Sequence, residues 1–529
     1  MSRFRYRLIQ ILILVSFFII VARLFNLQII QGSKFYKRVK QLRTNVKSLT
    51  NRGEITDKFG KTLAMDIERY TLEYNPCEAS KKENKSVLAR ELAAIFDFPE
   101  SSKKLLYKKS SQTLAFNLTR EQVQKIRKLH SPSLYMRKVI TRFYPEDTFA
   151  SHLLGYVDLY GSARQGVELY HKEFLEQNPE AKLELTIDSR LQGFIEEKLD
   201  KHIEKTKAEQ GTAIVMDVKS AEILAWASSP AYNPNFYKDY SLRRLKNWSI
   251  VDVYQPGSIF KIITVASALD SKIIDSDYSF IDEGFIMVDK WRIQNHDYIK
   301  GKTEERELDL TGLFETSSNP FAAHLGLKMG KEVFHNYLKL FGFSQRTGVE
   351  LPGESTGLLR HHNTWKDSDL ASTAIGQGAI AVTPIQVLAA INTIANDGTW
   401  MQPTIIRNRN KAGLIQSKVK VIDPKIAKEI QIRLADSVAT NIKEKWAKAG
   451  NVSGIRVAGK TGTAQKIRKD GRYSHYNTIA SFVGFYPAEN PKYISLVVID
   501  DPKTDGRWGD TVAGPLFNEI TNYVKNLYL

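Results

Sequence analysis

Ser258-Ile259-Phe260-Lys261 follows Pro256-Gly257 and opens the apolar run Ile262-Ile263-Thr264-Val265-Ala266. This run predicts a helix, and residues i and i+3 share a helix face, so Lys261 is expected beside Ser258. A serine hydroxyl is a poor nucleophile until a base takes its proton, and a lysine whose pKa is lowered by desolvation can be that base. The tetrad alone is a weak signal, because S-x-x-K also occurs among polar residues at positions 101–104 and 417–420.

Two further short motifs follow in the chain. Ser317-Ser318-Asn319 offers a hydroxyl that can relay a proton between Lys261 and a leaving amine, and an amide that can hold a substrate amide. Taken alone, the triplet is more typical of a helix cap or a turn before Pro320.

The third motif is Lys460-Thr461-Gly462-Thr463, on a predicted strand. Its ammonium and two hydroxyls suit a carboxylate, and Gly462 is interpreted as leaving room for a substrate backbone to approach the strand closely. Alone, this motif is more typical of an edge strand with a solvated lysine. The three motifs occur in the order S-x-x-K, S-x-N, K-T-G within one predicted domain. This combination is a more specific signal than any of the three motifs alone.

The third motif overlaps a nucleotide-binding signature. Residues 454–461 match G-x-x-x-x-G-K-T letter for letter. A phosphate-binding loop needs a buried strand before it and a helix after it. The preceding Ala449-Gly450-Asn451-Val452-Ser453 is too polar for such a strand, and Gly462 with the basic run after it is a poor helix, so we reject the nucleotide interpretation.

The segments around these motifs predict an α+β domain with one antiparallel sheet. Strands are expected at 183–187, 211–216, 222–227, 479–486 and 493–499, with a turn at 217–221 joining the second and third. Helices are expected after Pro256-Gly257 and over 514–529. Strands at both ends with helices between them are typical of this fold class.

The N-terminus predicts a membrane anchor. Arg3, Arg5 and Arg7 precede a mainly apolar run over residues 8–22, long enough with its flanks to cross a bilayer. The arginines place the N-terminus in the cytoplasm and the rest of the chain outside. A cleaved signal peptide would need a small-x-small site after the run, and none is present. A buried core helix is disfavoured by the flanking arginines.

The composition of the chain indicates the kind of partner that the protein binds and excludes some kinds of site. The 529 residues carry a formal net charge of +18, which suits an anionic partner. Nucleic acid would be the usual candidate, but the predicted anchor favours envelope polymers or lipid head groups instead. The single cysteine, Cys77, excludes an intramolecular disulfide framework and the cysteine clusters of structural zinc sites.

Further stretches carry a resemblance to a known family along nearly the whole chain. They are Leu185-Thr186-Ile187-Asp188 with Leu191-Gln192, Tyr254-Gln255-Pro256-Gly257-Ser258, Gly376-Gln377-Gly378 with Thr383-Pro384-Ile385-Gln386, the K-T-G-T-A-Q of 460–465, and, earlier, Arg52-Gly53, Asp57, Gly60, Arg142, Tyr144-Pro145 and Gly166-Val167-Glu168. With the three motifs, they resemble class B penicillin-binding proteins, the monofunctional peptidoglycan transpeptidases. The S-S-N and K-T-G forms look more like the division (septal) type than the elongation type.

Some positions depart from the family pattern. Asp147 stands where glycine is usual, and Val218 and Ala221 replace the usual proline and glycine of a hairpin turn. Asp tolerates a positive φ better than most residues, so we expect the first turn to survive.

The resemblance implies a fold and a site. The expected domains are a cytoplasmic tail and transmembrane anchor (1–30), an N-terminal pedestal of the dimerisation type (31–178) and a penicillin-binding, β-lactamase-like transpeptidase domain (179–529). The implied catalytic residues are Ser258, Lys261, Ser317, Asn319 and Lys460. Thr461, Gly462 and Thr463 are implied in substrate binding, and no metal or cofactor is called for.

The resemblance also implies an activity and its setting. A D-alanyl-D-alanine stem peptide would acylate Ser258, and the acyl group would then pass to an acceptor amine. This reaction would cross-link peptidoglycan during septal wall synthesis. β-Lactams would inhibit it covalently. The alternatives are an elongation-type transpeptidase and a D,D-carboxypeptidase that uses water. The expected partners are stem peptides, the lipid-linked precursor, a membrane glycosyltransferase of the shape/division family and other divisome proteins, with no nucleic acid. The expected location is the bacterial inner membrane, single-pass, with a periplasmic catalytic domain.

Overall fold

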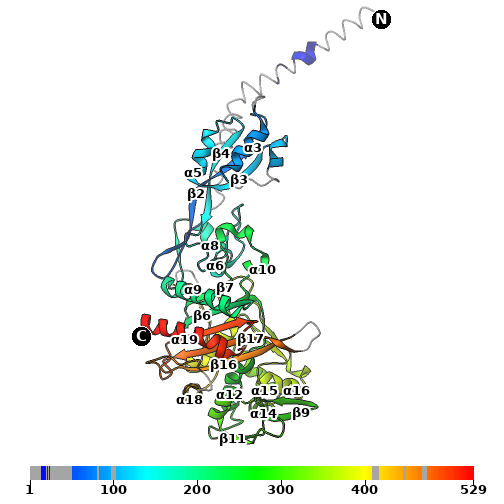
Figure 1. Cartoon of the computed structure of the whole chain (residues 1–529), viewed down its shortest axis with the longest axis vertical. Helices are drawn as coiled ribbons and strands as arrows, with labels where there is room; N and C mark the ends of the chain where they lie inside the picture. Colours follow the sequence, from blue (N-terminus) through cyan, green and yellow to red (C-terminus); the bar gives the residue numbers. More distant parts are fainter. Residues whose placement is uncertain are drawn as a thin grey trace, which may run out of the picture. The chain divides into compact units, whose positions relative to one another are not determined.

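The structure is a computed structural model (Figure 1) that describes residues 14–18, 21, 23, 51–79, 83–96, 103–407, 416–444, 448–467, 473–504 and 506–529. It divides into two compact units, one of residues 1–51, 66–142 and 159–161, the other of residues 52–65, 143–158 and 162–529. Most of the predicted anchor lies outside the described residues. Among the residues that are described, no helix has the length and apolar character needed to cross a membrane.

The first unit is built on strands. β2 (Thr62–Tyr74) pairs with β3 (Gln112–Leu118) and with β4 (Leu134–Phe143). Tyr70, Leu72 and Tyr74 alternate along β2, and Leu72 and Tyr74 are fully buried. Around them pack α3 (Lys85–Ala93), η2 (Lys104–Tyr107) and α5 (Arg120–Lys128), the last begun by a Thr119–Gln122 capping box.

The second unit begins with a small parallel pair, β1 (Glu54–Thr56) on β5 (Lys182–Glu184). The buried Arg52 donates to Glu168 at 2.9 Å, a charge-assisted bond between two of the family-like blocks. Asp147 adopts φ = 51°, so the turn survives without glycine, as predicted. Ala221 also takes a positive φ, 55°, in the turn after β6. The short helices α6 (Ser151–Leu154), α7 (Gly166–Tyr170) and α8 (Lys172–Gln177) belong to this region.

The second unit is organised around an antiparallel sheet, as the sequence predicted, and this sheet has five strands. Its order is β16-β17-β18-β6-β7, with strands Ala458–Ile467, Tyr473–Tyr486, Tyr493–Asp500, Gln210–Asp217 and Ile223–Ser229. The turn at 217–221 joins β6 to β7 as expected, while the predicted strand over 183–187 is confined to β5, followed by an isolated bridge from Leu185 to Ile406. β16 is an edge strand.

Helices cover both faces of this sheet, which makes the domain α+β. Figure 1 shows α9 (Ser189–Thr206) and α19 (Gly509–Tyr528) beside it, and they pack on β7 and on β17 and β18. α12 (Lys261–Asp270), α17 (Pro384–Ala395) and α18 (Pro424–Lys443) belong to the core on the other face. Successive β18 residues alternate between the two cores: Val497 belongs to the first, and Leu496 and Val498 to the second. The last helix starts at Gly509, five residues before the predicted start.

The rest of the second unit forms a helical region beyond α12. Its helices are α13 (Leu310–Thr316), α14 (Asn319–Met329), α15 (Lys331–Leu340) and α16 (Asp367–Ala374), and its hairpins are β8 (Phe280–Asp282) with β11 (Arg306–Leu308) and β9 (Phe285–Val288) with β10 (Trp291–Gln294). The remaining short elements are η3 (Pro234–Asp239), α10 (Leu242–Leu245), α11 (Trp248–Val251), η4 (Gly257–Phe260), η5 (His362–Thr364), β12 (Leu358–Leu359), β13 (Ile380–Ala381), β14 (Thr399–Met401) and β15 (Lys418–Lys420).

Candidate active site

Ser258 lies on the single 3-10 turn η4, which leads directly into α12 at Lys261. The turn packs against β16: Gly257 has φ = 60°, and a Cβ there would lie 2.9 Å from the carbonyl oxygen of Thr463. A side chain at 257 would therefore force the nucleophile segment away from the third motif. Ser258 itself is partly exposed, whereas Ile259 and Phe260 are buried and anchor the turn.

Lys261 is completely buried, but polar groups surround its side-chain nitrogen. Its Nζ donates to Asn319 Oδ1 at 2.7 Å, to Ser317 Oγ at 3.2 Å and to the carbonyl oxygen of Ser317. The structure therefore brings the first and second motifs together, 56 to 58 residues apart in the chain.

The pKa of Lys261 lies well below its usual value. Burial is the main cause, because it disfavours the charged form, and the nearby positive charge of Lys460 adds to it. The carboxylate of Asp282 acts in the opposite direction. A lysine in this environment gives up its proton more readily than an exposed lysine, and its neutral amine can accept one from a hydroxyl.

The second motif lies at the junction of two helices. Ser317 follows α13 in the left-handed region, φ = 55°, and Asn319 begins α14. Ser318 between them is buried and caps α14 by accepting from the backbone N–H of Phe321 at 3.1 Å. This cap turns Ser317 and Asn319 toward Lys261.

A buried carboxylate supports this junction, and sequence reasoning missed it. Asp282, fully buried at the end of β8, accepts hydrogen bonds from Ser318 Oγ at 2.7 Å, from Asn295 Nδ2 at 2.8 Å and from the N–H of Gly284 at 2.7 Å. Asn295 in turn accepts from the backbone N–H of Asn319 at 2.8 Å. Asp282 and Asn295 therefore position the S-x-N residues. No sequence signal marks them, because each belongs to a short segment outside any motif.

The third motif lies on a strand, as predicted, and this strand, β16, is at the edge of the sheet. Lys460 is 5% exposed, and burial lowers its pKa to about 8. Thr463 Oγ1 accepts from the N–H of Gly509, the first residue of α19, at 2.9 Å. The interpretation of Gly462 as a gap for the substrate needs correction: a Cβ there would lie 2.5 Å from Ser481 Oγ and 2.9 Å from Ile259 Cγ1. Glycine at 462 admits the protein's own nucleophile turn.

The three motifs line one cleft of about 680 Å³, which includes Ser258, Ser317, Asn319, Lys460, Thr461 and Thr463. Residues outside any motif also line it, among them His296, Arg306 and Trp508. The rings of His296 and Trp508 have centroids 6.3 Å apart. Trp508 precedes α19, and His296 follows the Asn295 that holds Asn319, so the cleft joins the sheet to the helical region.

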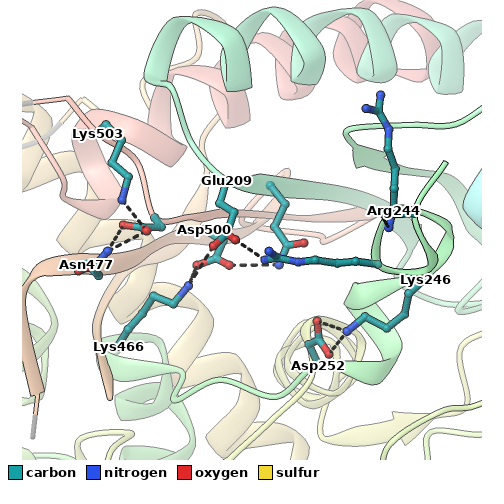
Figure 2. A network of polar contacts seen from close by, with 12 residues as sticks. Glu209, Arg244, Lys246, Asp252, Lys466, Asn477, Asp500 and Lys503 are labelled. Carbon is teal, nitrogen blue, oxygen red and sulfur yellow. Dashed lines mark hydrogen bonds and ion pairs between the residues drawn. The ribbon is translucent and has the colours of Figure 1, made fainter. Parts of the chain in front are cut away.

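Ion pairs hold the C-terminal end of β16, beyond the third motif (Figure 2). Lys466 Nζ lies 2.8 Å from Asp500 Oδ1 on β18 and 3.6 Å from Glu209 Oε2 before β6. Asp500 and Asp501 lie next to each other here, and Asp501 binds Asn477 Nδ2 and Lys503. These contacts cross from the edge strand to the middle of the sheet, and they tie the strand that carries Lys460 to its neighbours.

The competing sequence signals do not form the sites that they would need. Residues 454–457 form a loop and 458–461 begin β16, so no helix follows the nucleotide-binding signature. Of the other two S-x-x-K tetrads, 418–420 is the exposed strand β15, and Ser101 and Ser102 lie outside the described residues. Among the residues placed by the structure, no group of three or more His, Cys, Asp or Glu side chains is arranged to hold a metal.

Comparison with known proteins agrees with this site. The penicillin-binding protein transpeptidase domain matches residues 211–522, and the penicillin-binding protein dimerisation domain matches residues 47–215. Stage V sporulation protein D of Bacillus subtilis is 32% identical over 98% of this chain and 85% of its own length, and peptidoglycan D,D-transpeptidase FtsI of Escherichia coli K12 is 28% identical over 98% and 90%. Penicillin-binding protein 3 of Mycobacterium tuberculosis, solved with aztreonam, shares the fold with a TM-score of 0.69 at 23% identity, over 91% of this chain and 96% of that one. The chain belongs to the penicillin-binding protein transpeptidase family, as a class B member of the FtsI type and a serine-type peptidoglycan D,D-transpeptidase.

Proposed function

We propose that Ser258 is the nucleophile that takes the acyl group from a D-alanyl-D-alanine stem peptide. Its hydroxyl attacks the carbonyl carbon of the penultimate D-alanine, an ester forms, and the terminal D-alanine leaves as the amine. The observation that carries this proposal is the convergence of Ser317, Asn319 and Lys460 around a buried lysine three residues from Ser258.

Lys261 is the general base of this proposal. A neutral lysine amine keeps two N–H groups, and the carbonyl oxygen of Ser317 and Oδ1 of Asn319 can accept both. Its lone pair is then free to take the proton of a hydroxyl. Burial favours the neutral amine by lowering the pKa of Lys261, since the ammonium form would be desolvated.

The remaining motif residues bind and protonate the leaving group. Lys460, Thr461 and Thr463 hold the terminal carboxylate, with Gly462 keeping the strand close to the nucleophile turn. The backbone N–H groups of Ser258 and Thr463 serve as the oxyanion hole, where donors stabilise the developing charge. The proton reaches the departing amine through Ser317 and Lys460, and neither metal nor cofactor takes part.

The acceptor in the second half-reaction distinguishes a transpeptidase from a carboxypeptidase. We propose that the side-chain amine of a second stem peptide attacks the ester and releases Ser258, which cross-links two peptidoglycan strands. Attack by water instead would make the protein a carboxypeptidase. The family match supports the amine, and a paired assay of dimer formation and hydrolysis with one donor separates the two outcomes.

The cellular setting is part of the proposal. Residues 1–30 act as a cytoplasmic tail and single-pass anchor, 31–178 as a pedestal and 179–529 as the periplasmic transpeptidase domain. The name of the E. coli relative and the S-S-N motif support a role in septal synthesis with a membrane glycosyltransferase and other divisome proteins. The name of the B. subtilis relative points to sporulation, so depletion of the protein in dividing cells is the discriminating experiment.

Covalent labelling tests the nucleophile. The solved M. tuberculosis relative was crystallised with the β-lactam aztreonam, which supports the use of such a probe. A fluorescent penicillin should label membranes that contain this protein, Ser258→Ala should abolish the label, and peptide mapping should locate it at Ser258. Labelling that persists in Ser258→Ala would reject the assignment. A reporter fused near residue ~40 tests the topology, and activity of one that works only in the cytoplasm would overturn it.

A further inference from the structure

The positive charge of the chain is not spread evenly over its two units. Residues 66–142 of the first unit hold 16 Lys and Arg residues against 9 Asp and Glu residues. The second unit holds 50 against 49 and is close to neutral. A local excess of one sign of charge bears on the partners of a protein rather than on its fold, so the first unit is the place to look for an anionic partner.

Part of this excess is concentrated at the 3-10 turn η2, where residues 104–109 read K-L-L-Y-K-K. Leu106 is fully buried and fixes the turn to the core of the first unit. The three lysines of this stretch are exposed, and the side chain of Tyr107 is 60% exposed. We define the η2 patch as these side chains together with the neighbouring lysine of α3: Lys85, Lys104, Tyr107, Lys108 and Lys109.

The start of α3 completes the η2 patch. Nζ of Lys85 lies 5.2 Å from the centroid of the Tyr107 ring, and the hydroxyls of Ser86 and Tyr107 lie 3.3 Å apart. Asn84 caps this helix by accepting from the N–H of Ser86 at 2.9 Å. Two ordered elements therefore present the charges and the ring together, although about 20 residues separate them in the chain.

Carboxylates of the protein do not neutralise the η2 patch. Elsewhere in the first unit, Lys125 pairs with Glu121 at 2.6 Å and Lys138 pairs with Glu68. Within the described ranges 66–79, 83–96 and 103–142, no lysine of the η2 patch forms an ion pair. Their ammonium groups are therefore available to an anion from outside the chain.

We propose that the η2 patch binds the phosphate groups of anionic phospholipids at the surface of the membrane that holds the chain. This inference rests on the anchor of the proposed function and adds a second, peripheral attachment for the first unit. Clustered lysines near a bilayer are attracted to anionic lipids. A tyrosine ring lies readily at the level of the head groups, with its hydroxyl in water and its carbons among the upper acyl chains.

The exposed ring favours a lipid surface over the other source of phosphate, a soluble anionic wall polymer. Such a polymer has no apolar layer that could receive the ring of Tyr107. The anchor also favours the membrane, because the stretch between the predicted span and residue 51 cannot exceed about 90 Å even when fully extended. A tether of this length gives the patch a high effective concentration at the bilayer, so a weak site is sufficient.

The experiment uses the single, exposed cysteine of the chain as a reporter. Cys77 belongs to the first unit and is labelled with a fluorescent donor in the full-length protein. The protein is inserted into nanodiscs that contain an acceptor-labelled lipid and either phosphatidylcholine alone or equal parts of phosphatidylcholine and phosphatidylglycerol. Energy transfer should be higher in the anionic nanodiscs, and about 0.5 M salt should remove the difference because it screens exposed charges.

Two triple variants with the same loss of charge locate the site. Replacement of Lys104, Lys108 and Lys109 by glutamine should weaken docking about 100-fold, since each lysine at an anionic bilayer contributes about fivefold, and transfer should fall to its value in phosphatidylcholine. Replacement of Arg120, Arg127 and Lys128 by glutamine, at or next to α5, is the control and should keep the native difference. All six side chains are exposed, so neither triple should disturb the fold.

The outcomes separate the η2 patch from its alternatives. Equal transfer in the two kinds of nanodisc, or an equal loss in both triple variants, would overturn the inference. So would binding of a soluble glycerol-phosphate polymer that the Lys104, Lys108 and Lys109 triple abolishes, if phosphatidylglycerol had no effect. Tyr107→Ser should weaken docking to the anionic nanodiscs, which a purely ionic contact would not show. Failure of the native chain to insert into either nanodisc would instead reject the proposed anchor.

Discussion

Nζ of Lys261 lies 2.7 Å from Oδ1 of Asn319, although the two residues belong to different helices and different motifs. An amide oxygen at this position accepts a hydrogen bond without adding charge. This neutrality matters, because a carboxylate at hydrogen-bond distance would stabilise the ammonium form and undo the effect of burial.

Asn319→Asp should therefore slow acylation and move its pH dependence. The new carboxylate raises the pKa of Lys261, so the amine keeps its proton at neutral pH and the acidic limb of the pH–rate profile moves to higher pH. An opposite charge this close shifts a pKa by one or more units, so we expect a loss of about tenfold or more at pH 7. The measurement is the second-order rate of acylation by benzylpenicillin from pH 5.5 to 9.5. An acidic limb that stays in place would show that Lys261 is not the base.

Asp282→Asn should move the same limb in the opposite direction. The carboxylate of Asp282 raises the pKa of Lys261, so its removal lowers that pKa further and carries the acidic limb to lower pH. The rate should also fall by about 10- to 100-fold, because Ser318 and Asn295 lose the acceptor that positions the S-x-N residues.

Asp309→Asn is the matched control for Asp282→Asn. Asp309 caps α13, the helix that ends at Ser317, by accepting from the N–H of Gly312 at 2.7 Å, and asparagine caps helices equally well. This control should keep both the rate and the limb. A loss of rate in Asp282→Asn without a shift of the acidic limb of the pH–rate profile would show that Asp282 has only a structural role.

The residues that support the S-x-N junction could not be predicted from the sequence, whereas the motifs could. The three motifs and the β6–β7 hairpin were predicted because their signals are local: fixed spacing, a turn, an apolar run. Asp282 lies on a three-residue strand that pairs with another three-residue strand later in the chain, so nothing around it in the sequence marks a role. Gly462 was recognised but misinterpreted, because its neighbours Ile259 and Ser481 come from distant parts of the chain. The early start of α19 has a similar origin, since Gly509 packs against the carbonyl oxygen of Gly462.

Gly462→Ala should impair the enzyme by overpacking. The added methyl would meet Ser481 Oγ and Ile259 Cγ1, so β16 and the nucleophile turn must separate. We expect a loss of stability of about 1–3 kcal/mol and slower acylation by benzylpenicillin. Both quantities are measurable on the purified protein, by thermal unfolding and by stopped-flow labelling.

A second-site change tests the cause of the Gly462→Ala defect. Ser481→Ala removes the atom that the new methyl would meet first, at 2.5 Å, so it should restore part of the stability and rate of Gly462→Ala. If glycine were needed instead for close approach of substrate, Ser481→Ala would restore nothing, and slow acylation would persist in a fully stable protein.

Lys460 should control the alkaline side of the pH profile. Burial lowers its pKa to about 8, so the ammonium that holds the substrate carboxylate is lost as the pH rises through that value, and acylation should decline there. Lys460→Ala should reduce the rate at pH 7 by about 10²–10³, the usual effect of removing one donor at a preorganised site. Lys460→Arg should also be slow, because a guanidinium holds its proton too tightly to relay it, yet its alkaline limb should move to higher pH. The rates are compared with and without Mg-ATP, since residues 454–461 match a nucleotide-binding signature. Normal acylation in Lys460→Ala, or ATP binding that this variant abolishes, would contradict the acyl-transfer role of the motif.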